Sequence, residues 1–332
     1  MNKLGFWIKN ARHIALPQSV LPALLALAMA GTHADFSWWL GIIALFGIIC
    51  AHLGMNLADD YFDYKVKSGE NRNEMAAEGM RARIAKYPYL TSGQATLKQL
   101  AIAIVVFLFI AIICGSIILY FRGIPILYIA LIGGFLGISY SGWPFRLCYH
   151  GYGELVIGLL FGPLLMIGMQ YAAAGVFDAT IVLVSIPVGL LVTNILFSHS
   201  IMDAIPDEKM GKMTFARLLA KPKLILFFSS LLIFLPFIFI AIGVVVGLLH
   251  WAYLSIFVLL PMAIYLVHSL VQFVNHKTVT IKLQPWMGPM GAFDTYREIG
   301  IDWFMLRWLL ARNLVTFFCL ILVLVNIILI FI

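Results

Sequence analysis

Carboxylates gather at two places in a chain that otherwise contains few of them. Only 15 of the 332 residues are acidic, and six of these lie in residues 56–63 (NLADDYFD) and 203–208 (DAIPDE). In each segment the oxygen-bearing side chains have the i, i+4 or i+7 spacing of one helical face, namely Asn56, Asp60 and Asp63 in the first and Asp203 and Asp207 in the second. Mg²⁺ prefers such oxygen ligands. Two such faces opposed across a helical bundle would form a divalent-cation site.

Basic residues follow both acidic segments closely. They are Lys65, Lys67 and Arg72 after the first segment, and Lys209, Lys212 and Arg217 after the second. A diphosphate site needs carboxylates to bind a metal that bridges phosphate oxygens, and lysine or arginine to neutralise the remaining charge. Any one of these lysines, taken alone, is better explained as an anchor at the membrane face. Because the arrangement occurs twice, we interpret it as a metal–diphosphate site.

The elements that position these segments are apolar helices. The chain is 63% hydrophobic and 11% charged, with a mean hydropathy of +1.00, which is typical of helical membrane proteins. A membrane-spanning helix needs roughly 20 apolar residues. Nine stretches approach or exceed that length, at residues 14–33, 37–57, 99–121, 124–141, 153–176, 178–198, 223–248, 250–273 and 313–332. The sequence therefore predicts an all-α protein with nine transmembrane helices in a single domain, 1–332.

The distribution of positive charge indicates the orientation of this bundle. Of the 22 lysines and arginines, only Arg122 falls on one side of the predicted spans and the other 21 fall on the opposite side. By the positive-inside rule the N-terminus and the loops 59–98, 199–221 and 274–312 are cytoplasmic, and the C-terminus is outside. The net charge of +7 thus reflects membrane topology, so nucleic acid is not an expected partner. The four scattered cysteines suggest neither a disulfide framework nor a zinc site.

The third loop differs from the other two. Residues 284–291 are broken by proline and glycine, and residues 295–312 mix tryptophans with charged residues. The second part is expected to be an amphipathic helix at the inner interface that leads into the last span. A lid over the site is the alternative.

Both acidic segments resemble the aspartate-rich motifs of the UbiA superfamily of intramembrane prenyltransferases, over residues 56–63 and 203–214. Residues 89–93 (YLTSG) and 140–154 add features that are most similar to its menaquinone branch, the 1,4-dihydroxy-2-naphthoate polyprenyltransferases. The resemblance covers about residues 10–275. It implies a UbiA-like bundle with a central cavity that opens to the cytoplasmic side.

The resemblance also implies Mg²⁺-dependent transfer of a polyprenyl group from an isoprenyl diphosphate to an aromatic acceptor, by an integral protein of the bacterial inner membrane. Two Mg²⁺ ions would be bound by Asn56, Asp60, Asp63, Asp203 and Asp207. The implied catalytic residues are Asp60, Asp63, Asp203, Asp207 and Lys212. The implied substrate-binding residues are Arg12, Asn56, Lys65, Arg72, Tyr140, Arg146, Tyr149, Glu154, His199 and Lys209.

The chain departs from the family pattern at several positions. Asp59 stands where the family usually has asparagine, and Lys67 where a third aspartate is common. Residues 199–203 (HSIMD) lack the amides and the arginine of the usual Asn-Asn-x-Arg-Asp. These changes leave open another acceptor, such as a 4-hydroxybenzoate-like aromatic or a glycerol phosphate.

Two other classes of membrane protein compete with a prenyltransferase. A proton-coupled transporter would need ionisable residues in the middle of its spans, whereas these carboxylates lie at helix ends beside lysines. A CDP-alcohol phosphotransferase would need an Asp-Gly-x-x-Ala-Arg run, which this sequence lacks. The sequence therefore favours a prenyltransferase.

Overall fold

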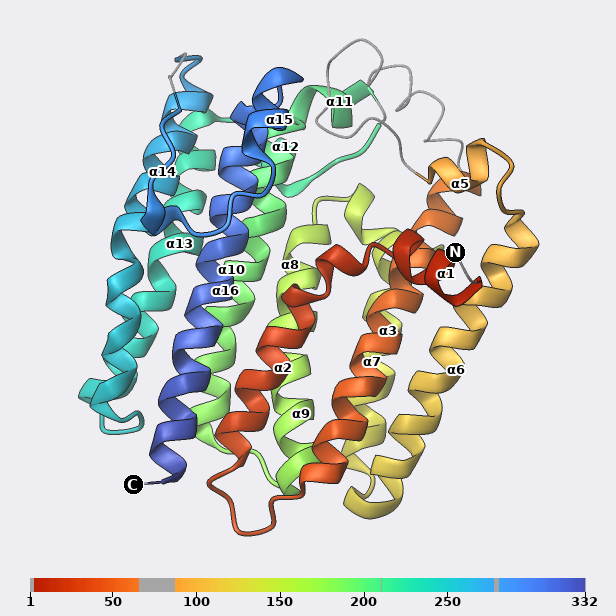
Figure 1. The fold of residues 1–332 in the computed structure, drawn as a ribbon, viewed down its shortest axis with the longest axis vertical. Coiled ribbons are helices and arrows are strands. Elements are labelled where there is room, and N and C mark those ends of the chain that lie inside the picture. The colour runs from red at the N-terminus through yellow and green to blue at the C-terminus, as the bar shows by residue number, and fades with distance from the viewer. Residues whose placement is uncertain (1–2, 66–86, 210, 278–280, 332) are drawn as a thin grey trace.

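A computed structural model of the chain describes residues 3–65, 87–209, 211–277 and 281–331. Within these ranges the protein is helical, and its single β-bridge joins His150 to Met213. The long helices run side by side, and most of the short ones gather at one end of the bundle (Figure 1). This architecture confirms the predicted all-α class.

Eight helical segments are long and apolar enough to cross a membrane. They are η1–α2 (His13–Ala30), α3 (Trp38–Lys65), α6 (Leu97–Arg122), α8–η3–α9 (Gly153–Ala174), α10 (Ala179–Met202), α13 (Pro222–Val245), η4–α14 (Trp251–Val274) and α16 (Asp302–Ile330). A ninth apolar helix, α7 (Pro125–Ser141), has only 17 residues. The protein is thus an integral membrane protein, and the count of nine crossings stays a prediction.

Short helices form most of the connections at the end of the bundle that holds the acidic segments, which we call the carboxylate end. They are α1 (Lys3–Asn10), α5 (Pro88–Thr91), η2 (Leu147–Tyr149), α11 (Ala204–Lys209), α12 (Phe215–Leu219), η5 (Pro285–Met287) and α15 (Phe293–Glu298). At the opposite end, short turns join α2 to α3, α6 to α7 and α9 to α10 (Figure 1).

Local sequence signals determine where several helices begin. Thr96 and Gln99 form a capping box at the start of α6, because each side chain accepts a hydrogen bond from the other residue's backbone N–H. The side chain of Asp178 accepts a hydrogen bond from the Ile181 N–H at the start of α10. Proline occupies the first position of α2, α7 and α13, where its missing N–H costs no hydrogen bond.

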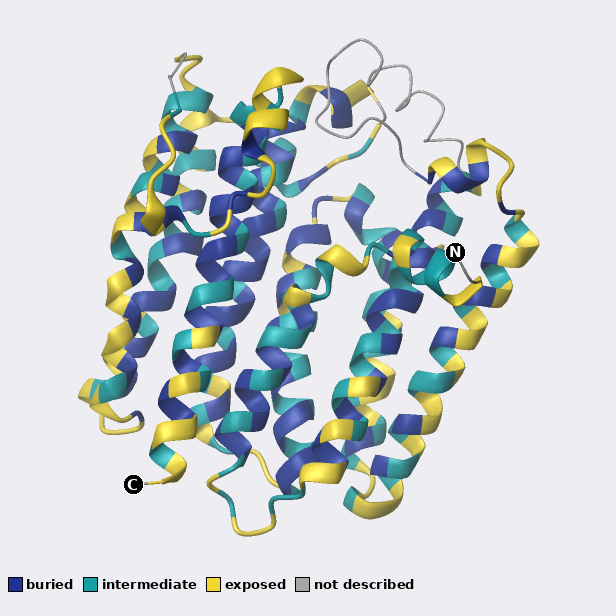
Figure 2. Ribbon diagram, viewed as in Figure 1, coloured by how far each residue is buried: buried dark blue, intermediate teal, exposed yellow. Residues whose placement is uncertain are grey.

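Buried apolar side chains form two clusters. The larger joins α2, α9, α10, α13, α14 and α16, and the smaller joins α1, α3, α5 and α6. Helix α10 is the most deeply buried span (Figure 2). It crosses η3 (Leu160–Leu164) where Gly162 faces Gly189, and a Cβ atom on Gly162 would lie 2.5 Å from the Gly189 Cα. Glycine at both positions therefore allows these two backbones to touch.

The C-terminal region corrects one prediction. Residues 295–312 do not form a separate amphipathic helix, because α15 ends at Glu298 and α16 runs without a break from Asp302 to Ile330. Arg307 is buried within α16, where it donates hydrogen bonds to the carbonyl oxygens of Ser269, at 2.9 Å, and Trp303. Since the guanidinium finds its partners inside the bundle, the helix does not need to keep this charge at the surface.

Candidate active site

A cavity of about 1330 Å³ extends through the bundle from the carboxylate end. Apolar side chains of α6 and α7, including Leu108, Ile112 and Leu127, line one part of it. Polar residues line another part, namely Arg12, Asn56, Asp59, Glu154, His199, Ser200, Asp203, Asp207, Lys212 and Thr214. Both acidic segments therefore contribute carboxylates to the same cavity.

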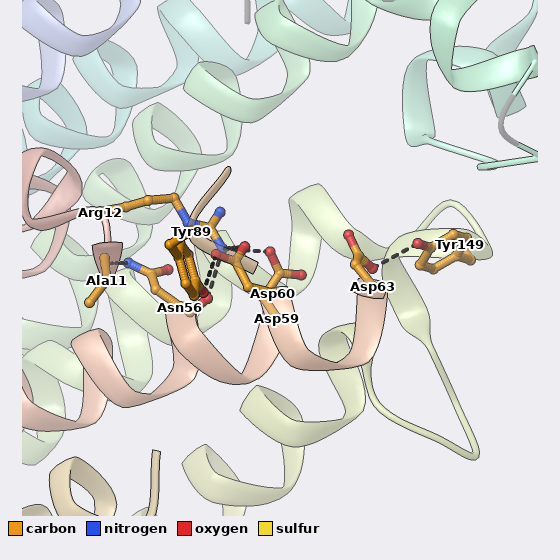
Figure 3. A network of polar contacts seen from close by, with 8 residues as sticks. All are labelled: Ala11, Arg12, Asn56, Asp59, Asp60, Asp63, Tyr89 and Tyr149. Carbon is orange, nitrogen blue, oxygen red and sulfur yellow. Dashed lines mark hydrogen bonds and ion pairs between the residues drawn. The ribbon is translucent and has the colours of Figure 1, made fainter. Parts of the chain in front are cut away.

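Arg12 connects the N-terminal segment to the first acidic segment on the last turns of α3 (Figure 3). Its Nη2 donates to Asp59 Oδ2 at 2.7 Å, to Asp60 Oδ1 at 3.0 Å and to the Asn56 carbonyl oxygen at 2.8 Å. In return, Asn56 Nδ2 donates to the carbonyl oxygen of Ala11 at 3.0 Å. These bonds fix the position of the acidic turn relative to the entry into α2.

Asp60 lies behind the cavity wall. It is buried, and its two oxygens accept hydrogen bonds from Arg12 and from the Tyr89 hydroxyl, which is 3.0 Å from Oδ2. Asp59 lines the cavity in its place. Sequence reasoning missed Asp59, although the i, i+3, i+7 spacing of Asn56, Asp59 and Asp63 also describes one helical face. That second spacing was the available signal.

The protonation states of Arg12 and Tyr89 are fixed by burial and by the neighbouring carboxylates. Burial disfavours the charged form of Arg12, but Asp60 and Asp59 outweigh burial and raise the pKa of the guanidinium above its ordinary value. Burial also raises the pKa of the Tyr89 hydroxyl, and the Asp60 carboxylate raises it further. Arg12 therefore stays positive and Tyr89 stays a hydrogen-bond donor across the physiological pH range.

Tyr149 links the first acidic segment to the second. Its hydroxyl donates to Asp63 Oδ1 at 2.7 Å (Figure 3), and the Arg146 guanidinium lies 4.0 Å from the centre of its ring. Lys212 Nζ is 6.0 Å from the same ring centre. The Gly151 N–H also donates to the Met213 carbonyl oxygen at 2.7 Å. The connection before α8 therefore fastens the end of α3 to the segment that follows Asp207.

The second acidic segment lies where a long helix stops and a short one starts. Helix α10 ends at Met202, and α11 begins at Ala204, so Asp203 occupies the junction. Asp203 and Asp207 are each only 2% exposed, yet both line the cavity. His199 lies one turn earlier, with its Nε2 3.6 Å from Asp203 Oδ2. This arrangement holds two carboxylates and an imidazole on one wall.

Glu154 holds this wall to α8. It is buried, and its Oε1 accepts hydrogen bonds from the Ser200 hydroxyl at 2.6 Å and from the Phe215 N–H at 3.1 Å. Glu154 also lines the cavity, together with Tyr140 of α7. Its bonds thus position α10 and the start of α12 around the site.

The predicted site residues fall into two groups. Those that line the cavity are Arg12, Asn56, Tyr140, Glu154, His199, Asp203, Asp207 and Lys212. Those that lie outside its lining are Asp60, Asp63, Lys65, Arg146, Tyr149 and Lys209. Lys65 is exposed and lies 4.7 Å from the centre of the Tyr61 ring, and Lys209 is exposed on α11. Arg72 lies outside the described residues.

The donors in the cavity suit Mg²⁺. Asn56, Asp59, Asp203 and Asp207 supply amide and carboxylate oxygens. Within the described ranges, no three histidine, cysteine or acidic side chains are grouped closely enough to enclose a metal by themselves. Mg²⁺ is commonly bound by one or two carboxylates together with substrate phosphates, and these donors fit that mode of binding.

The sequence matches one family model and several characterised proteins. The family model for UbiA prenyltransferases matches residues 19–287. The 1,4-dihydroxy-2-naphthoate octaprenyltransferase of Bacillus subtilis is 28% identical over 204 residues, which are 61% of this chain and 62% of that protein. The chain thus matches less than two thirds of that relative's length. The 2-carboxy-1,4-naphthoquinone phytyltransferase of Synechocystis is 27% identical over 274 residues, 80% of this chain and 83% of that protein.

Two solved structures share the fold. A digeranylgeranylglyceryl phosphate synthase superposes with a TM-score of 0.63 at 15% identity, covering 98% of this chain and 99% of that one. A UbiA homologue from Archaeoglobus fulgidus, bound to GPP and Mg²⁺, superposes with a TM-score of 0.59 at 14% identity, covering 93% and 99%. At such identities the likeness establishes the fold. With the match over residues 19–287, it shows that this chain belongs to the UbiA prenyltransferase family.

Proposed function

We propose that this chain transfers a polyprenyl group from an isoprenyl diphosphate to an aromatic acceptor, 1,4-dihydroxy-2-naphthoate, in menaquinone biosynthesis. The observation that supports it most is a single cavity with an apolar part and a part lined by carboxylates and bases. The naphthoate octaprenyltransferase of B. subtilis supports the choice of acceptor. The Archaeoglobus homologue bound to GPP and Mg²⁺ supports the choice of donor.

The donor substrate matches both parts of the cavity. Its prenyl tail would lie along the apolar wall of α6 and α7, and its diphosphate would lie near Lys212. Asn56, Asp59, Asp203 and Asp207 would hold Mg²⁺, which when bound would neutralise the diphosphate and make it a better leaving group. In this proposal Asp60 is a positioning residue, because Arg12 and Tyr89 occupy both of its oxygens.

The reaction exchanges one bond for another. The allylic C–O bond of the donor breaks, and its electron pair leaves with the diphosphate. Ring π electrons of the acceptor then form the new C–C bond, and the attacked ring carbon loses its proton or carboxylate to restore aromaticity. Tyr140 lines the cavity and would stabilise the allylic cation through its ring. His199, which is oriented by Asp203, would accept the proton of an acceptor hydroxyl.

The same proposal includes a location and an orientation. We place the protein in the bacterial inner membrane with its carboxylate end and N-terminus in the cytoplasm. The 21-to-1 distribution of lysine and arginine supports this orientation, and it would expose the polar part of the cavity to soluble Mg²⁺.

An acceptor screen tests the proposal. Purified protein would receive an isoprenyl diphosphate, Mg²⁺ and one acceptor at a time, namely 1,4-dihydroxy-2-naphthoate, 4-hydroxybenzoate or a glycerol phosphate. We expect prenylated naphthoate and stoichiometric diphosphate, lost on addition of EDTA and restored by Mg²⁺. Full activity in EDTA would contradict the metal requirement. Product with glycerol phosphate alone would contradict the aromatic acceptor.

A further inference from the structure

Part of the cavity wall lies beyond the region that the family model matches. That match ends at residue 287, whereas Tyr296 of α15 and Phe304, Trp308 and Arg312 of α16 all line the cavity. These residues complete the cavity from a part of the chain that the family pattern does not define. Residues of this wall could therefore determine which substrate this chain prefers.

Three lysine or arginine residues line the cavity, and two of them already have a clear task. Arg12 holds Asp59, Asp60 and the backbone of α3. Lys212 lies beside the second acidic segment, where its backbone N–H donates to the Asp207 carbonyl oxygen at 2.8 Å, and the proposed function assigns its side chain to the diphosphate. Arg312 is different, since no carboxylate among the described residues lies within ion-pair distance of it. Its charge is therefore available for an anion in the cavity.

The neighbours of Arg312 hold its guanidinium in place without neutralising it. Nη2 donates to the Pro289 carbonyl oxygen and to Asn313 Oδ1, both at 2.9 Å, and Nε donates to the same Oδ1 at 3.3 Å. Asn313 Nδ2 in turn donates to the carbonyl oxygens of Met287 at 2.7 Å and Pro289 at 3.0 Å. Nη1 donates no hydrogen bond within the described part of the chain. The guanidinium is thus fixed but retains an unused donor.

Arg312 lies well away from the acidic segments. Phe304 contacts the ring of His199, with the ring centres 5.1 Å apart. Arg312 comes eight residues later on the same uninterrupted helix, so it lies about 12 Å further along the axis at 1.5 Å per residue. Trp308 comes between them, and its ring centre is 5.8 Å from the Arg312 guanidinium carbon. An anion bound here would therefore be distinct from the diphosphate and would lie beside an aromatic surface.

We propose that Arg312 binds the carboxylate of the aromatic acceptor while Trp308 packs against its ring, so that this wall selects arene carboxylates. The inference rests on the proposed prenyl transfer and adds a residue that determines its specificity. Guanidinium and carboxylate groups form bidentate, charge-assisted hydrogen bonds, and an indole ring provides a flat apolar contact.

The test compares two acceptors in two variants. Arg312→Gln removes the charge, and Arg312→Lys keeps the charge but loses the planar fork. Arg297→Gln is the control, because Arg297 is an exposed partner of Asp294 outside the cavity lining. The acceptors are 1,4-dihydroxy-2-naphthoate and 1,4-dihydroxynaphthalene, which lacks the carboxylate. Steady-state KM and kcat are measured for each acceptor and for the isoprenyl diphosphate.

We expect Arg312→Gln to raise the KM of the carboxylated acceptor about 10- to 100-fold, the range for loss of one charged hydrogen bond. The KM values of the decarboxylated acceptor and of the diphosphate should stay unchanged, and Arg312→Lys should give a smaller increase. Quenching of tryptophan fluorescence by the acceptor, without the diphosphate, should show the same loss of affinity. Should Arg312→Gln fail to fold, Arg312→Lys is expected to show its smaller KM increase against the Arg297→Gln control.

Three outcomes separate this inference from the proposed function. Equal preference for the carboxylated acceptor in wild type and Arg312→Gln would overturn the role of Arg312 and leave prenyl transfer intact. A raised KM for the diphosphate in the variant would overturn it too, because Arg312 would then bind the donor. Wild-type protein that prenylates neither acceptor would contradict the proposed function and this inference together.

Discussion

Arg12 and Arg122 lie at opposite ends of the bundle and fasten their surroundings in different ways. Arg12 binds two carboxylates and one carbonyl oxygen at the carboxylate end. Among the residues that the structure describes, Arg122 donates only to carbonyl oxygens, those of Asp35 at 3.0 Å, Ala172 at 3.0 Å and Ala173 at 2.5 Å. Arg12 therefore belongs to a network of charged side chains, whereas Arg122 connects the end of α6 to the end of α9 and to the turn between α2 and α3.

The difference indicates which end can do chemistry. Backbone carbonyl oxygens carry no net charge, so an arginine bound to them holds the backbone in place without forming a site for a cation. A carboxylate carries a full negative charge, so Asp59, which lines the cavity beside Arg12, can also contribute to binding a metal ion. We therefore expect ligands to bind at the carboxylate end, whereas the contacts of Arg122 hold helix ends together at the opposite end.

The largest expected effect lies at the carboxylate end. Asp203→Asn keeps the shape of the side chain but removes a charged oxygen from the cavity. We expect prenyl transfer to fall about 100-fold or more, which corresponds to about 3 kcal/mol in the transition state. The melting temperature should change little. The check is initial rates at saturating Mg²⁺, and a variant with wild-type rates would break the proposed contrast between the ends.

Arg12→Gln tests whether the charge network also stabilises the fold. The substitution leaves the buried Asp60 carboxylate without its cationic partner, and breaking a buried pair costs about 3 kcal/mol. We expect a lower melting temperature in detergent and a loss of activity. Adding Asp60→Asn should recover part of the stability, since the uncompensated charge is gone. No recovery in the double variant would argue against the pair as the cause.

Arg122→Gln tests whether the opposite end of the bundle contributes to stability but not to catalysis. It removes hydrogen bonds to three carbonyl oxygens, so we expect a loss of about 2 kcal/mol in stability. The kcat and both KM values should stay at wild-type levels, because no carboxylate of the site contacts Arg122. Thermal denaturation and steady-state kinetics on the same preparation check this. A change in KM would show that the two ends are coupled.

The smallest effect concerns Asp178, the cap of α10 at the opposite end. Burial acts to raise the pKa of this carboxyl, but hydrogen bonds from Thr180 and Ile181, together with His33, lower it below its ordinary value. The charged cap therefore contributes stability that is fully present above about pH 4, the ordinary value, and is lost as the pH falls through the lower folded-state pKa.

Asp178→Ala should cost about 1 kcal/mol at neutral pH. The difference in melting temperature from wild type should narrow as the pH drops below 4, with activity at neutral pH unchanged. A difference that stays constant with pH would mean that the charge of Asp178 does not contribute.

The sequence predicted the helices and the carboxylate-bearing segments, but not the face that each segment presents. Asp59 and Asp60 are adjacent on α3, and two spacings fit the same segment equally well. The choice between them depends on where Arg12 and Tyr89 lie, and these residues come from distant parts of the chain. Local periodicity contains no information about such contacts.

The C-terminal wall shows the same limit. The mixture of tryptophan and charge in residues 295–312 is typical of a surface helix, and the chain buries part of it because Arg307 finds carbonyl partners on α14 and on its own helix. The position of Arg312 was equally hidden, since it depends on the segment around Pro289 folding back onto α16. Tertiary hydrogen bonds decided both cases.

Helix α7 has one further consequence, for the lipid around it. Its 17 residues extend about 26 Å at 1.5 Å per residue, which is shorter than the roughly 30 Å hydrocarbon layer of a typical bilayer. Two of its exposed side chains, Tyr128 and Ile132, lie outside the cavity lining. As the predicted ninth crossing, α7 would require the acyl chains beside it to compress, and we expect the membrane to be locally thinned along this helix.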